Sequence, residues 1–592
     1  MKSRLTAVVF LLASFFAPIL AAQSYSVKVE RDIEIKMRDG VVLRGDIFRP
    51  DAEGKFPVLL QRTPYRRSIP WGYNVDFAQR AASRGYVVFL QDVRGRYTSD
   101  GDWYPFIHEA DDGYDTIEWV AAQPYSNGKV GMFGGSYVGA TQMLAAIAHP
   151  PHLAGICPVV TASNYHDGWT YQGGAFEQWF NQSWTTGLAQ DTVLHQIERM
   201  PGTPEAVEVL PLTQYPIFNT NPASVVNGGA AVVAPYYLEW LGHPTYDDYW
   251  KRVSIEEHFS HINVPALHIA AWYDIFLGGS LRNYIGIKAS GGSESAKKGQ
   301  QLLVTIGGHA GSGRKIGALD FGPEALKNDE DDVTLAWYDY LFKGVQNDFA
   351  SAKPVKIFVL GINQWRQEDD WPLARAKSTK YFLHSNGDAN SNKGSGSLSP
   401  AEPGKEPQDK YIYDPANPVP TEGGPLCCDS RRHGGPWDQR AVEQREDVLV
   451  YSTAVLERDL EVTGPMRLDF FASSSAVDTD FTAKLVDVYP DGTAINLAEG
   501  ILRAKYRDSQ EKATLLTPGK VYQLTIDLWA TSNVFKAGHR IRLEVSSSNF
   551  PRFDRNLNTG ESAATSDKWA TATNMIFHDK DHPSALVLPI VM

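Results

Sequence analysis

Between residues 57 and 160, short apolar runs alternate with stretches of helical period, and this alternation limits the possible folds more than any other feature of the chain. Strands are expected at 57–60, 86–90, 129–133 and 155–160, and helices at 77–84, 114–122 and 137–148. The order strand, helix, strand predicts a parallel sheet with helices on both faces. Residues 33–45 alternate in polarity around Asp39-Gly40, so we expect this domain to open with an antiparallel hairpin.

The alternation stops near residue 161 and returns near residue 264. Two more buried strands, 264–271 and 302–306, and a helix at 333–342 then complete the pattern. We therefore assign 25–162 and 263–352 to one domain. The intervening residues 163–262 are rich in Trp, Tyr, Phe, Gly and Pro, and we expect them to form a cap over the carboxyl edge of the sheet, where such sheets bind ligands. A separately folded domain with no role in the pocket is the alternative.

The character of the chain changes again from residue 354 to residue 592. Helical periodicity largely disappears, and short alternating runs such as 356–360, 448–451, 466–471 and 541–545 are separated by Gly, Pro, Asp and Asn turns. This pattern predicts a β-sandwich or jelly roll. The polar stretch 385–409 is expected to be an exposed loop within it.

Length, charge and cysteine content exclude several classes of protein. A chain of 592 residues is too long for one core, and a formal net charge of −13 offers no basic field for nucleic acid. Three cysteines exclude a disulfide scaffold and a Cys₄ zinc site. Cys157 lies in an apolar run and is expected to be buried and inert. The adjacent Cys427 and Cys428 are compatible with a vicinal disulfide or with two free thiols, and the sequence leaves both open.

The first 22 residues have the order of a secretory signal peptide. Lys2 and Arg4 precede an apolar run that ends in the small pair Ala21-Ala22. The run is shorter than the roughly 20 residues of a membrane span, so we expect cleavage after export rather than a stable anchor. The mature protein is then periplasmic or secreted.

A candidate nucleophile follows the predicted strand 129–133. Ser136 stands in Gly134-Gly135-Ser136-Tyr137-Val138-Gly139, directly before a predicted helix. A serine on a tight turn from strand to helix is a nucleophile elbow, in which glycines avoid steric collision. The consensus G-x-S-x-G is matched in part, because Val138 occupies the second glycine position and Gly139 comes one residue later.

A serine hydroxyl needs a histidine to accept its proton and an acid to orient that histidine. In elbow enzymes these partners follow in the order Ser, Asp, His, each just beyond a strand. Asp274 follows the strand 264–271 and His309 follows the strand 302–306, so we predict Ser136, Asp274 and His309 as a catalytic triad. The oxyanion needs two donors, for which we predict the backbone N–H of Tyr137 and the phenol of Tyr65. Packing of Tyr65 at the pocket rim is the alternative.

Other chemistries find little support in the sequence. His258 and His261 have a HxxH spacing but no H-E-x-x-H motif, and there is neither a Walker A loop nor a dinucleotide fingerprint. We therefore expect no cofactor and no metal.

Several motifs in the same order resemble the CocE/NonD hydrolases, the group of cocaine esterase, Xaa-Pro dipeptidyl-peptidase, α-amino acid ester hydrolase and glutaryl acylase. They lie at 62–65, 92–96, 134–139, 272–274, around His309, and at 420–424, 435–440 and 447–451, so the likeness spans nearly the whole mature chain. The resemblance implies an α/β-hydrolase domain, a helical cap and a C-terminal jelly roll. It also implies Ser136, Asp274 and His309 as the triad, with Tyr65 and Tyr137 as the oxyanion hole.

Departures from the family pattern bear on specificity. In the α-amino acid ester hydrolases, acids follow the triad Asp by two and three positions, whereas this chain has Phe276 and Leu277 there. We also expect this protein to lack the large N-terminal extension of the Xaa-Pro dipeptidyl-peptidases. The residues predicted to contact substrate are the aromatic side chains Trp169, Tyr171, Phe176, Trp272 and Phe276.

The sequence thus predicts an exported serine hydrolase that cleaves an ester, or an amide, of an uncharged, apolar or aromatic acyl group through an acyl-enzyme. Xaa-Pro dipeptidyl-peptidase activity and α-amino acid ester or β-lactam acylase activity are the alternatives within the family. A non-catalytic secreted protein that binds a ligand or glycan is the alternative outside it. The expected partner is a small-molecule substrate, and the sequence does not define the oligomeric state.

Overall fold

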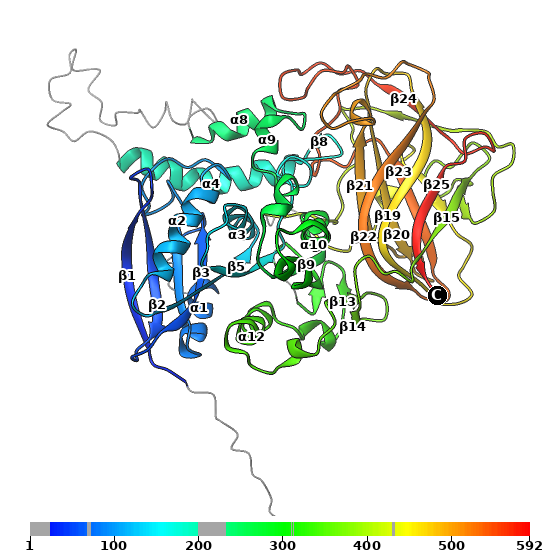
Figure 1. Cartoon of the computed structure of the whole chain (residues 1–592). Coiled ribbons are helices and arrows are strands. Elements are labelled where there is room, and N and C mark those ends of the chain that lie inside the picture. The colour runs from blue at the N-terminus through cyan, green and yellow to red at the C-terminus, as the bar shows by residue number, and fades with distance from the viewer. Residues whose placement is uncertain (1–23, 68–72, 199–232, 310, 312, 429–432) are drawn as a thin grey trace, which may run out of the picture.

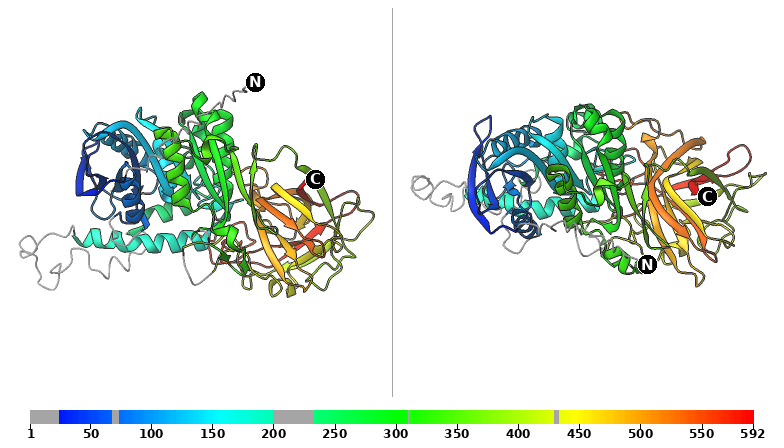
Figure 2. Two further views of the ribbon diagram at one scale, coloured as in Figure 1. Left: turned by 90° about the horizontal axis from the view of Figure 1, so that it is seen from below. Right: turned by 60° about the horizontal axis from the view of Figure 1, so that its bottom comes forward.

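The structure is a computed structural model that describes residues 24–67, 73–198, 233–309, 311, 313–428 and 433–592. It contains an α/β domain, a helical segment over one end of that domain's sheet, and an all-β domain beside it (Figures 1 and 2). The predicted fold class, an α/β-hydrolase domain with an inserted cap and a C-terminal jelly roll, is confirmed. The predicted signal peptide, residues 1–22, lies outside the described residues.

The α/β domain is built on a sheet with the strand order β1-β2-β4-β3-β5-β6-β9-β10-β13-β14. Pairing is antiparallel at both edges and parallel from β4 through β13, with the predicted hairpin as β1 and β2. The strands are β1 (Val27–Lys36), β2 (Val42–Pro50), β3 (Phe56–Thr63), β4 (Val87–Asp92), β5 (Ser126–Gly135), β6 (Leu153–Val159), β9 (Ala266–Tyr273), β10 (Gln300–Gly308), β13 (Val355–Val359) and β14 (Gln364–Glu368). Central strands such as β4 and β9 are buried at every residue, as expected for a sheet covered on both faces.

Helices cover both faces of this sheet. Helices α1 (Tyr73–Ser83) and α12 (Glu330–Lys343) pack into one hydrophobic cluster with the sheet, while α2 (Glu109–Ala121) and α3 (Tyr137–Ile147) pack into another. The remaining short elements of the domain are α10 (Leu277–Ser290), α11 (Glu294–Lys298), η3 (Pro323–Leu326), η4 (Asp348–Ala350) and the hairpin β11 (Lys315–Ile316) with β12 (Leu319–Asp320). Because the central strands are parallel, their carboxyl ends all lie at one edge of the sheet. Residues that follow β3, β5, β9 and β10 therefore meet at that edge.

The cap lies across that carboxyl edge (Figure 1). Its described elements are β7 (Tyr171–Gln172), β8 (Ala175–Phe176), α4 (Gln178–Glu198), α8 (Pro235–Gly242), α9 (Asp248–Lys251) and η2 (Glu256–His261). The start of α4 is tied to the C-terminal domain, because Trp179 N–H donates to the Pro551 carbonyl at 3.0 Å and Phe176 N–H donates to Asp554 Oδ1 at 2.8 Å. The all-β domain thus helps to hold the cap in place over the sheet.

The described residues of the C-terminal domain form β-strands, loops and two short turns of helix. Its strands are β15 (Lys377–His384), β16 (Ser397–Ser399), β17 (Asp409–Tyr413), β18 (Leu449–Ser452), β19 (Leu460–Ser474), β20 (Asp480–Val488), β21 (Ala494–Arg503), β22 (Tyr522–Phe535), β23 (Arg540–Ser546), β24 (Ala572–Phe577) and β25 (Ala585–Val591), with η5 (Val442–Gln444) and η6 (Ala504–Tyr506). Alternate side chains of these strands enclose a separate aliphatic and aromatic core.

The boundary between the two domains differs from the sequence prediction. We assigned 356–360 to the C-terminal domain, but the structure places β13 in the first sheet, parallel to β10 and antiparallel to β14. An isolated apolar run of this length is compatible with either sheet, so local pattern does not settle its partner. Backbone hydrogen bonds also link the two domains here. The Leu360 N–H donates to the Ser532 carbonyl, and the Val534 N–H donates to the Leu360 carbonyl.

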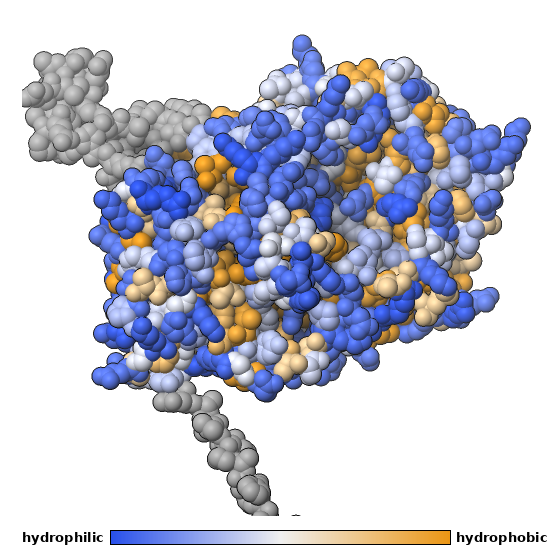
Figure 3. All heavy atoms as spheres, in the orientation of Figure 1, coloured by the Kyte–Doolittle hydropathy of each residue, from blue (hydrophilic) through white to orange (hydrophobic). Residues whose placement is uncertain are grey.

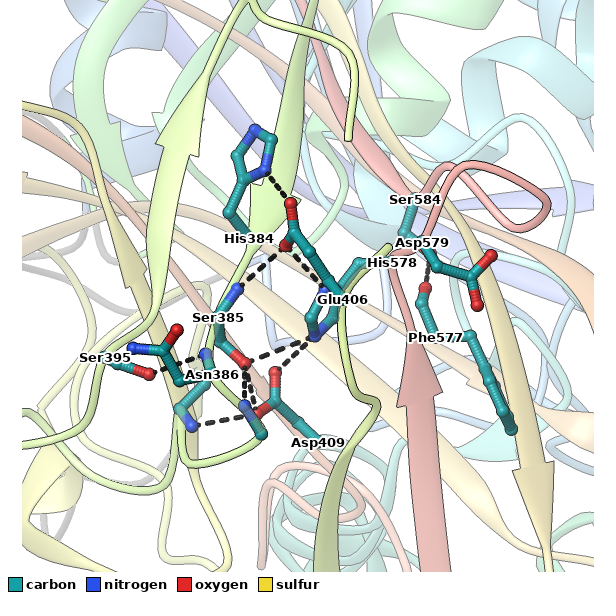
Figure 4. A network of polar contacts seen from close by, with 12 residues as sticks. His384, Ser385, Asn386, Ser395, Glu406, Asp409, Phe577, His578, Asp579 and Ser584 are labelled. Atoms are coloured by element: carbon teal, nitrogen blue, oxygen red, sulfur yellow. Dashed lines mark hydrogen bonds and ion pairs between the residues drawn. The ribbon is translucent and has the colours of Figure 1, made fainter. Parts of the chain in front are cut away.

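A buried polar network crosses the C-terminal domain between β15, β17 and β24 (Figure 4). Asp409 accepts hydrogen bonds from Ser385 Oγ at 2.6 Å, Tyr451 OH at 2.7 Å and the ring of His578 at 2.9 Å. The second ring nitrogen of His578 lies 3.3 Å from Glu406 Oε2, and Glu406 also contacts His384 at 2.8 Å. Residues 385–409, predicted to be an exposed loop, therefore begin and end at buried anchors.

The face drawn in Figure 3 is largely hydrophilic, with hydrophobic side chains in separate patches. Within the described ranges, no helix combines the length and apolarity that crossing a membrane requires.

Candidate active site

Ser136 lies on a strained turn between β5 and α3. Its φ of 63° and ψ of −128° are unusual for a residue with a side chain, and strain of this kind is typical of a nucleophile elbow. Its N–H donates to the Val159 carbonyl at 2.9 Å, so β6 holds the turn in place. Gly134 has a φ of 119°, and a Cβ there would lie 2.5 Å from a methyl group of Val138. The turn therefore needs glycine at this position.

The structure explains why Val138 is tolerated and where the later glycine is needed. Val138 is the second residue of α3 and packs back over Gly134, whereas Gly139 faces Thr161. A Cβ at Gly139 would lie 2.7 Å from the Thr161 side chain, which itself donates to the Ser136 carbonyl at 2.9 Å. Close packing of α3 against the segment that follows β6, rather than the turn itself, requires the second glycine.

The three predicted triad residues are brought together. His309 Nε2 lies 2.8 Å from Ser136 Oγ, and His309 Nδ1 lies 2.6 Å from Asp274 Oδ1. Ser136 follows β5, Asp274 follows β9 and His309 follows β10, so the parallel sheet brings together residues that lie 173 positions apart at most. Both contacts are within ordinary hydrogen-bond distance.

Asp274 is fully buried, and its second oxygen is also held. The N–H of Phe276 donates to Asp274 Oδ2 at 2.7 Å, which leaves Oδ1 for the imidazole. This geometry favours the tautomer of His309 with its proton on Nδ1, because that nitrogen faces an acceptor. Nε2 is then an acceptor for the Ser136 proton, as nucleophilic catalysis requires.

Tyr65 lies beside the nucleophile after β3. Its phenol contacts the Ser136 side chain and the backbone N–H of Tyr137, and it accepts a hydrogen bond at 3.0 Å from the Trp184 indole of α4. Because Trp184 donates to the phenol oxygen, the phenol's own proton is free to point into the site. Burial raises the pKa of Tyr65, so the phenol stays protonated as a donor.

The Tyr137 side chain anchors the second predicted donor, which is its own backbone N–H. The phenol accepts from the Phe106 N–H at 2.7 Å and donates to Glu109 Oε1 at 3.0 Å. Glu109 in turn forms a buried ion pair with Arg62 at 2.7 Å. This chain of contacts fixes the first turn of α3, and therefore the direction of its N–H. The sequence motif around Arg62 gave no sign of this positioning role.

Aromatic rings line the site around His309. The ring of Phe276 lies edge-on to the imidazole at 5.1 Å and stacks on Trp169 at 4.4 Å, while Phe180 of α4 meets Phe276 at 5.4 Å. Phe276 and Trp169 were predicted as substrate contacts, and the structure places both next to the triad. Phe180 and Trp184 were missed, although both lie in the aromatic stretch predicted to form the cap.

Three predicted substrate contacts lie elsewhere. Trp272 donates its indole N–H to the Phe358 carbonyl at 2.7 Å and packs against Trp371, in the cluster that joins β9 to β13, so its assignment to the substrate pocket is corrected. Tyr171 donates to the Trp240 carbonyl at 2.8 Å within the cap. Phe176 lines a separate cavity of about 500 Å³ between the cap and the C-terminal domain, whose lining includes Tyr237 and Trp569.

Glu177, at the start of the cap helix, is a buried acid that sequence reasoning missed. It is 1% exposed, and among the described residues its Oε1 has no hydrogen-bond partner. Burial raises the pKa of Glu177 to about 8, with Arg552 opposing the shift and Asp274 adding to it. The side chain is therefore neutral at pH 7, and Phe176-Glu177 in the sequence carried no signal that distinguished it from a surface acid.

Cys427 and Cys428 form a disulfide beside the triad, which resolves the alternative left open by the sequence. Their sulfurs and a ring nitrogen of His309 all lie within 4.8 Å of one another, the one group of three potential metal ligands with such spacing in the part of the chain that the structure describes. His258 and His261 are 5.3 Å apart between ring centroids and lie on η2, away from this group. Cys157 is a buried free cysteine, as expected.

Fold and site together define a serine hydrolase of the α/β-hydrolase class. Two family models match the chain: X-Pro dipeptidyl-peptidase (S15 family) over residues 39–311, and X-Pro dipeptidyl-peptidase C-terminal non-catalytic domain over residues 347–587. The chain belongs to this S15 family, and the resemblance to the CocE/NonD hydrolases is confirmed.

Individual relatives cover almost the whole chain. Cocaine esterase of Rhodococcus sp. (strain MB1 Bresler) is 38% identical over 585 residues, which is 95% of this chain and 98% of the esterase. An aminopeptidase from a marine sediment Thaumarchaeota archaeon is 25% identical, with a TM-score of 0.80 over 99% of each chain. An α-amino acid ester hydrolase is 26% identical, with a TM-score of 0.79 over 98% of this chain and 100% of its own. The chain is thus similar to an esterase, an aminopeptidase and an amino acid ester hydrolase.

Proposed function

We propose that this protein hydrolyses an ester, or more slowly an amide, of an uncharged apolar or aromatic acyl group through an acyl-enzyme. Ser136, His309 and Asp274 act as the triad, and Tyr65 with the Tyr137 N–H forms the oxyanion hole. The observation that carries the acyl preference is the ring of Phe276, stacked on Trp169 and edge-on to His309 where related ester hydrolases carry an acid.

The mechanism follows from the two short contacts of His309. Its Nε2 takes the Ser136 proton as Oγ attacks the carbonyl carbon, and Asp274 stabilises the imidazolium that forms. The Tyr65 O–H and the Tyr137 N–H donate to the oxygen of the tetrahedral intermediate. The imidazolium then gives its proton to the leaving alcohol or amine. A water molecule then attacks the acyl-enzyme through the same steps and releases the carboxylic acid.

Charge near the site argues against substrates with a free α-amine. A cationic amine needs an ionised carboxylate partner when it is buried. Glu177 is a buried acid of the cap, and burial raises its pKa to about 8, so an incoming amine meets a largely protonated carboxyl at pH 7. Asp274 is already bound by His309 and the Phe276 N–H. The similarity to cocaine esterase, higher than that to the aminopeptidase or the amino acid ester hydrolase, supports the same choice.

A matched pair of substrates tests this proposal. Methyl phenylacetate and phenylglycine methyl ester differ in the α-amine alone, so the ratio of their kcat/KM values measures the preference for a neutral acyl group. We expect the neutral ester to be favoured by about tenfold or more at pH 7, since an unpaired buried charge is costly. Faster turnover of phenylglycine methyl ester, or of glycyl-prolyl p-nitroanilide, contradicts the proposal.

Two serine variants establish that Ser136 carries the chemistry. A fluorophosphonate probe should label the wild type and fail to label Ser136→Ala. The matched control is Ser290→Ala, because Ser290 is an exposed serine whose hydroxyl caps a backbone carbonyl at the end of α10. Equal labelling of Ser136→Ala, or no labelling of the wild type, refutes the assignment and favours the alternative of a non-catalytic binding protein.

We also propose export, on the sequence of residues 1–22 alone. The N-terminal sequence of protein recovered from the periplasm or the medium of the producing cells tests it. A start near residue 23 supports cleavage, whereas an intact N-terminus in the cytoplasmic fraction contradicts it.

A further inference from the structure

The disulfide of Cys427 and Cys428 belongs to the C-terminal segment of the chain and lies beside the active site of the α/β domain. Its sulfurs and a ring nitrogen of His309 lie within 4.8 Å of one another. Cys427 is 7% exposed and packs in the same hydrophobic cluster as Phe276, whereas Cys428 is exposed. A reductant in solution therefore has access to this bond at Cys428, and the resulting thiols stay beside the imidazole.

We propose that reduction of this disulfide creates a metal site, in which Cys427, Cys428 and His309 bind a thiophilic divalent cation such as Zn²⁺. Two thiolates and one imidazole are ligands that zinc prefers, and three protein ligands with one open position are a common set. Zinc bonds of roughly 2.0–2.3 Å at tetrahedral angles separate the ligand atoms by roughly 3.3–3.8 Å. The three ligand atoms lie within 4.8 Å of one another, so breaking the S–S bond lets the sulfurs separate to this spacing while small side-chain movements bring the imidazole nitrogen to it.

The chemistry balances with a dithiol reductant as the co-reactant. One thiolate of the reductant attacks a protein sulfur and forms a mixed disulfide while the other protein sulfur leaves as a thiolate. The second thiol of the reductant then displaces the protein and closes a cyclic disulfide. The protein gains two electrons and two protons. Metal binding afterwards releases both thiol protons, because the ligands are thiolates.

The second shell of this metal site is already in place. Asp274 holds His309 Nδ1 at 2.6 Å, and a carboxylate on the distal nitrogen is the usual support of a metal-binding histidine. The nitrogen left for the metal is Nε2, which is also the nitrogen that lies 2.8 Å from Ser136 Oγ. A metal bound to Nε2 therefore occupies the nitrogen that would otherwise accept the Ser136 proton. The inhibition that follows rests on the proposed catalytic role of His309, whereas metal binding itself does not.

The test compares oxidised and reduced protein. The full chain is reduced with dithiothreitol, freed of reductant without air, and titrated with Co²⁺ and with Zn²⁺; an untreated sample is titrated in parallel. We expect Co²⁺–thiolate charge-transfer absorption in the reduced sample alone, at one ion per chain, and its loss on addition of Zn²⁺. We also expect Zn²⁺ to lower kcat of the reduced enzyme by about 100-fold or more, the usual contribution of a general base.

Cysteine variants decide between this site and other effects of reduction. Cys428→Ser and Cys427→Ser each remove one thiolate and should lose both the Co²⁺ absorption and the sensitivity to Zn²⁺. Cys157→Ala is the matched control, since Cys157 is buried in β6 and should keep the response of the reduced wild type. Co²⁺ absorption that persists in both serine variants, a reduced wild type without it, or equal inhibition of the oxidised enzyme overturns the proposal. An oxidised wild type without hydrolase activity refutes the proposed function instead, and the Co²⁺ spectrum still decides the metal site.

Discussion

Two clusters of serine, histidine and carboxylate in the described part of the chain differ in their geometry. In the α/β domain, one ring nitrogen of His309 faces Ser136 and the other faces a carboxylate. In the C-terminal domain, both ring nitrogens of His578 face carboxylates, and Ser385 Oγ, which lies 3.3 Å from the ring, donates its proton to Asp409 at 2.6 Å. The same residue types are therefore arranged for proton transfer in one place and for stability in the other.

The difference lies in where the charges are placed. Burial lowers the pKa of His578, but the hydrogen bond and charge of Asp409, together with Glu406, outweigh it and raise the pKa above its ordinary value. A protonated imidazole donates from both nitrogens and has no lone pair for a serine proton. Ser385 also accepts from the Gly387 N–H at 2.9 Å, so it is fully engaged. A residue inventory does not identify a catalytic site; the direction of each hydrogen bond does.

The sharpest test of this comparison removes each serine in turn. Ser136→Ala should lower kcat by about 10⁶-fold, because the nucleophile is lost while the fold is kept. Ser385→Ala should leave kcat within a few-fold of wild type and lower the free energy of unfolding by about 1–3 kcal/mol, since Asp409 loses a donor. Steady-state kinetics and urea unfolding of both variants measure this. A large catalytic defect in Ser385→Ala breaks the distinction.

Removal of the phenol beside Ser136 should have the next largest effect. Tyr65→Phe should lower kcat by about 10²–10³-fold with a small change in KM, because the oxyanion forms in the transition state alone. Tyr381→Phe, in the C-terminal domain, serves as the control. If Tyr65→Phe changes KM and leaves kcat unaltered, Tyr65 packs at the rim and does not donate to the oxyanion.

The carboxylate at the centre of the second cluster should matter for stability. Asp409→Asn removes one of the two carboxylates that His578 faces, and breaking a buried ion pair costs about 3–5 kcal/mol. We expect the free energy of unfolding to fall by about this amount while kcat of the folded enzyme stays close to wild type. Calorimetry and kinetics below the unfolding temperature check both parts. An unchanged unfolding free energy indicates that His578 is neutral in the fold.

The pH dependence of stability sharpens the comparison further. Because the folded pKa of His578 is raised, its contribution to stability is complete below the unfolded value of 6.5 and disappears as pH rises through the folded pKa. The pKa of Asp409 is lowered by its hydrogen bonds despite burial, so its contribution is lost as pH falls below its ordinary range. Urea midpoints of wild type and His578→Gln should therefore converge above pH 6.5 as pH increases. A constant difference contradicts the charged state of His578.

The smallest expected effect concerns Glu177, a buried acid of the cap. Glu177→Gln should match wild type in kcat/KM at pH 7, because Glu177 is protonated below its pKa of about 8. A raised carboxyl pKa means that the fold loses stability as pH rises from 4.5 toward 8, so the variant should be more stable than wild type above pH 8. Thermal unfolding between pH 6 and 9 measures the crossover. Equal pH dependence in both proteins shows that Glu177 does not titrate there.

Much of the fold and the triad follows from local pattern. The signals for the triad are short-range: a strand before Ser136, a helix after it, and an acid and a histidine just beyond later strands. The parallel sheet then places the residues that follow these strands side by side. The signals that failed were those whose partner is remote. Trp272 was placed in the pocket but packs on Trp371, and the run 356–360 was placed in the wrong sheet.

The sequence by itself determined the kinds of element, the elbow and the identity of its two triad partners, because each rests on steric and periodic rules that act over a few residues. Tertiary structure alone decided which aromatic rings face His309, that Glu177 is buried, and that Cys427 and Cys428 lie beside the imidazole. Those outcomes depend on how the cap and the C-terminal domain pack against the sheet. Burial, and with it the charge of a side chain, is a property of that packing and has no local signature.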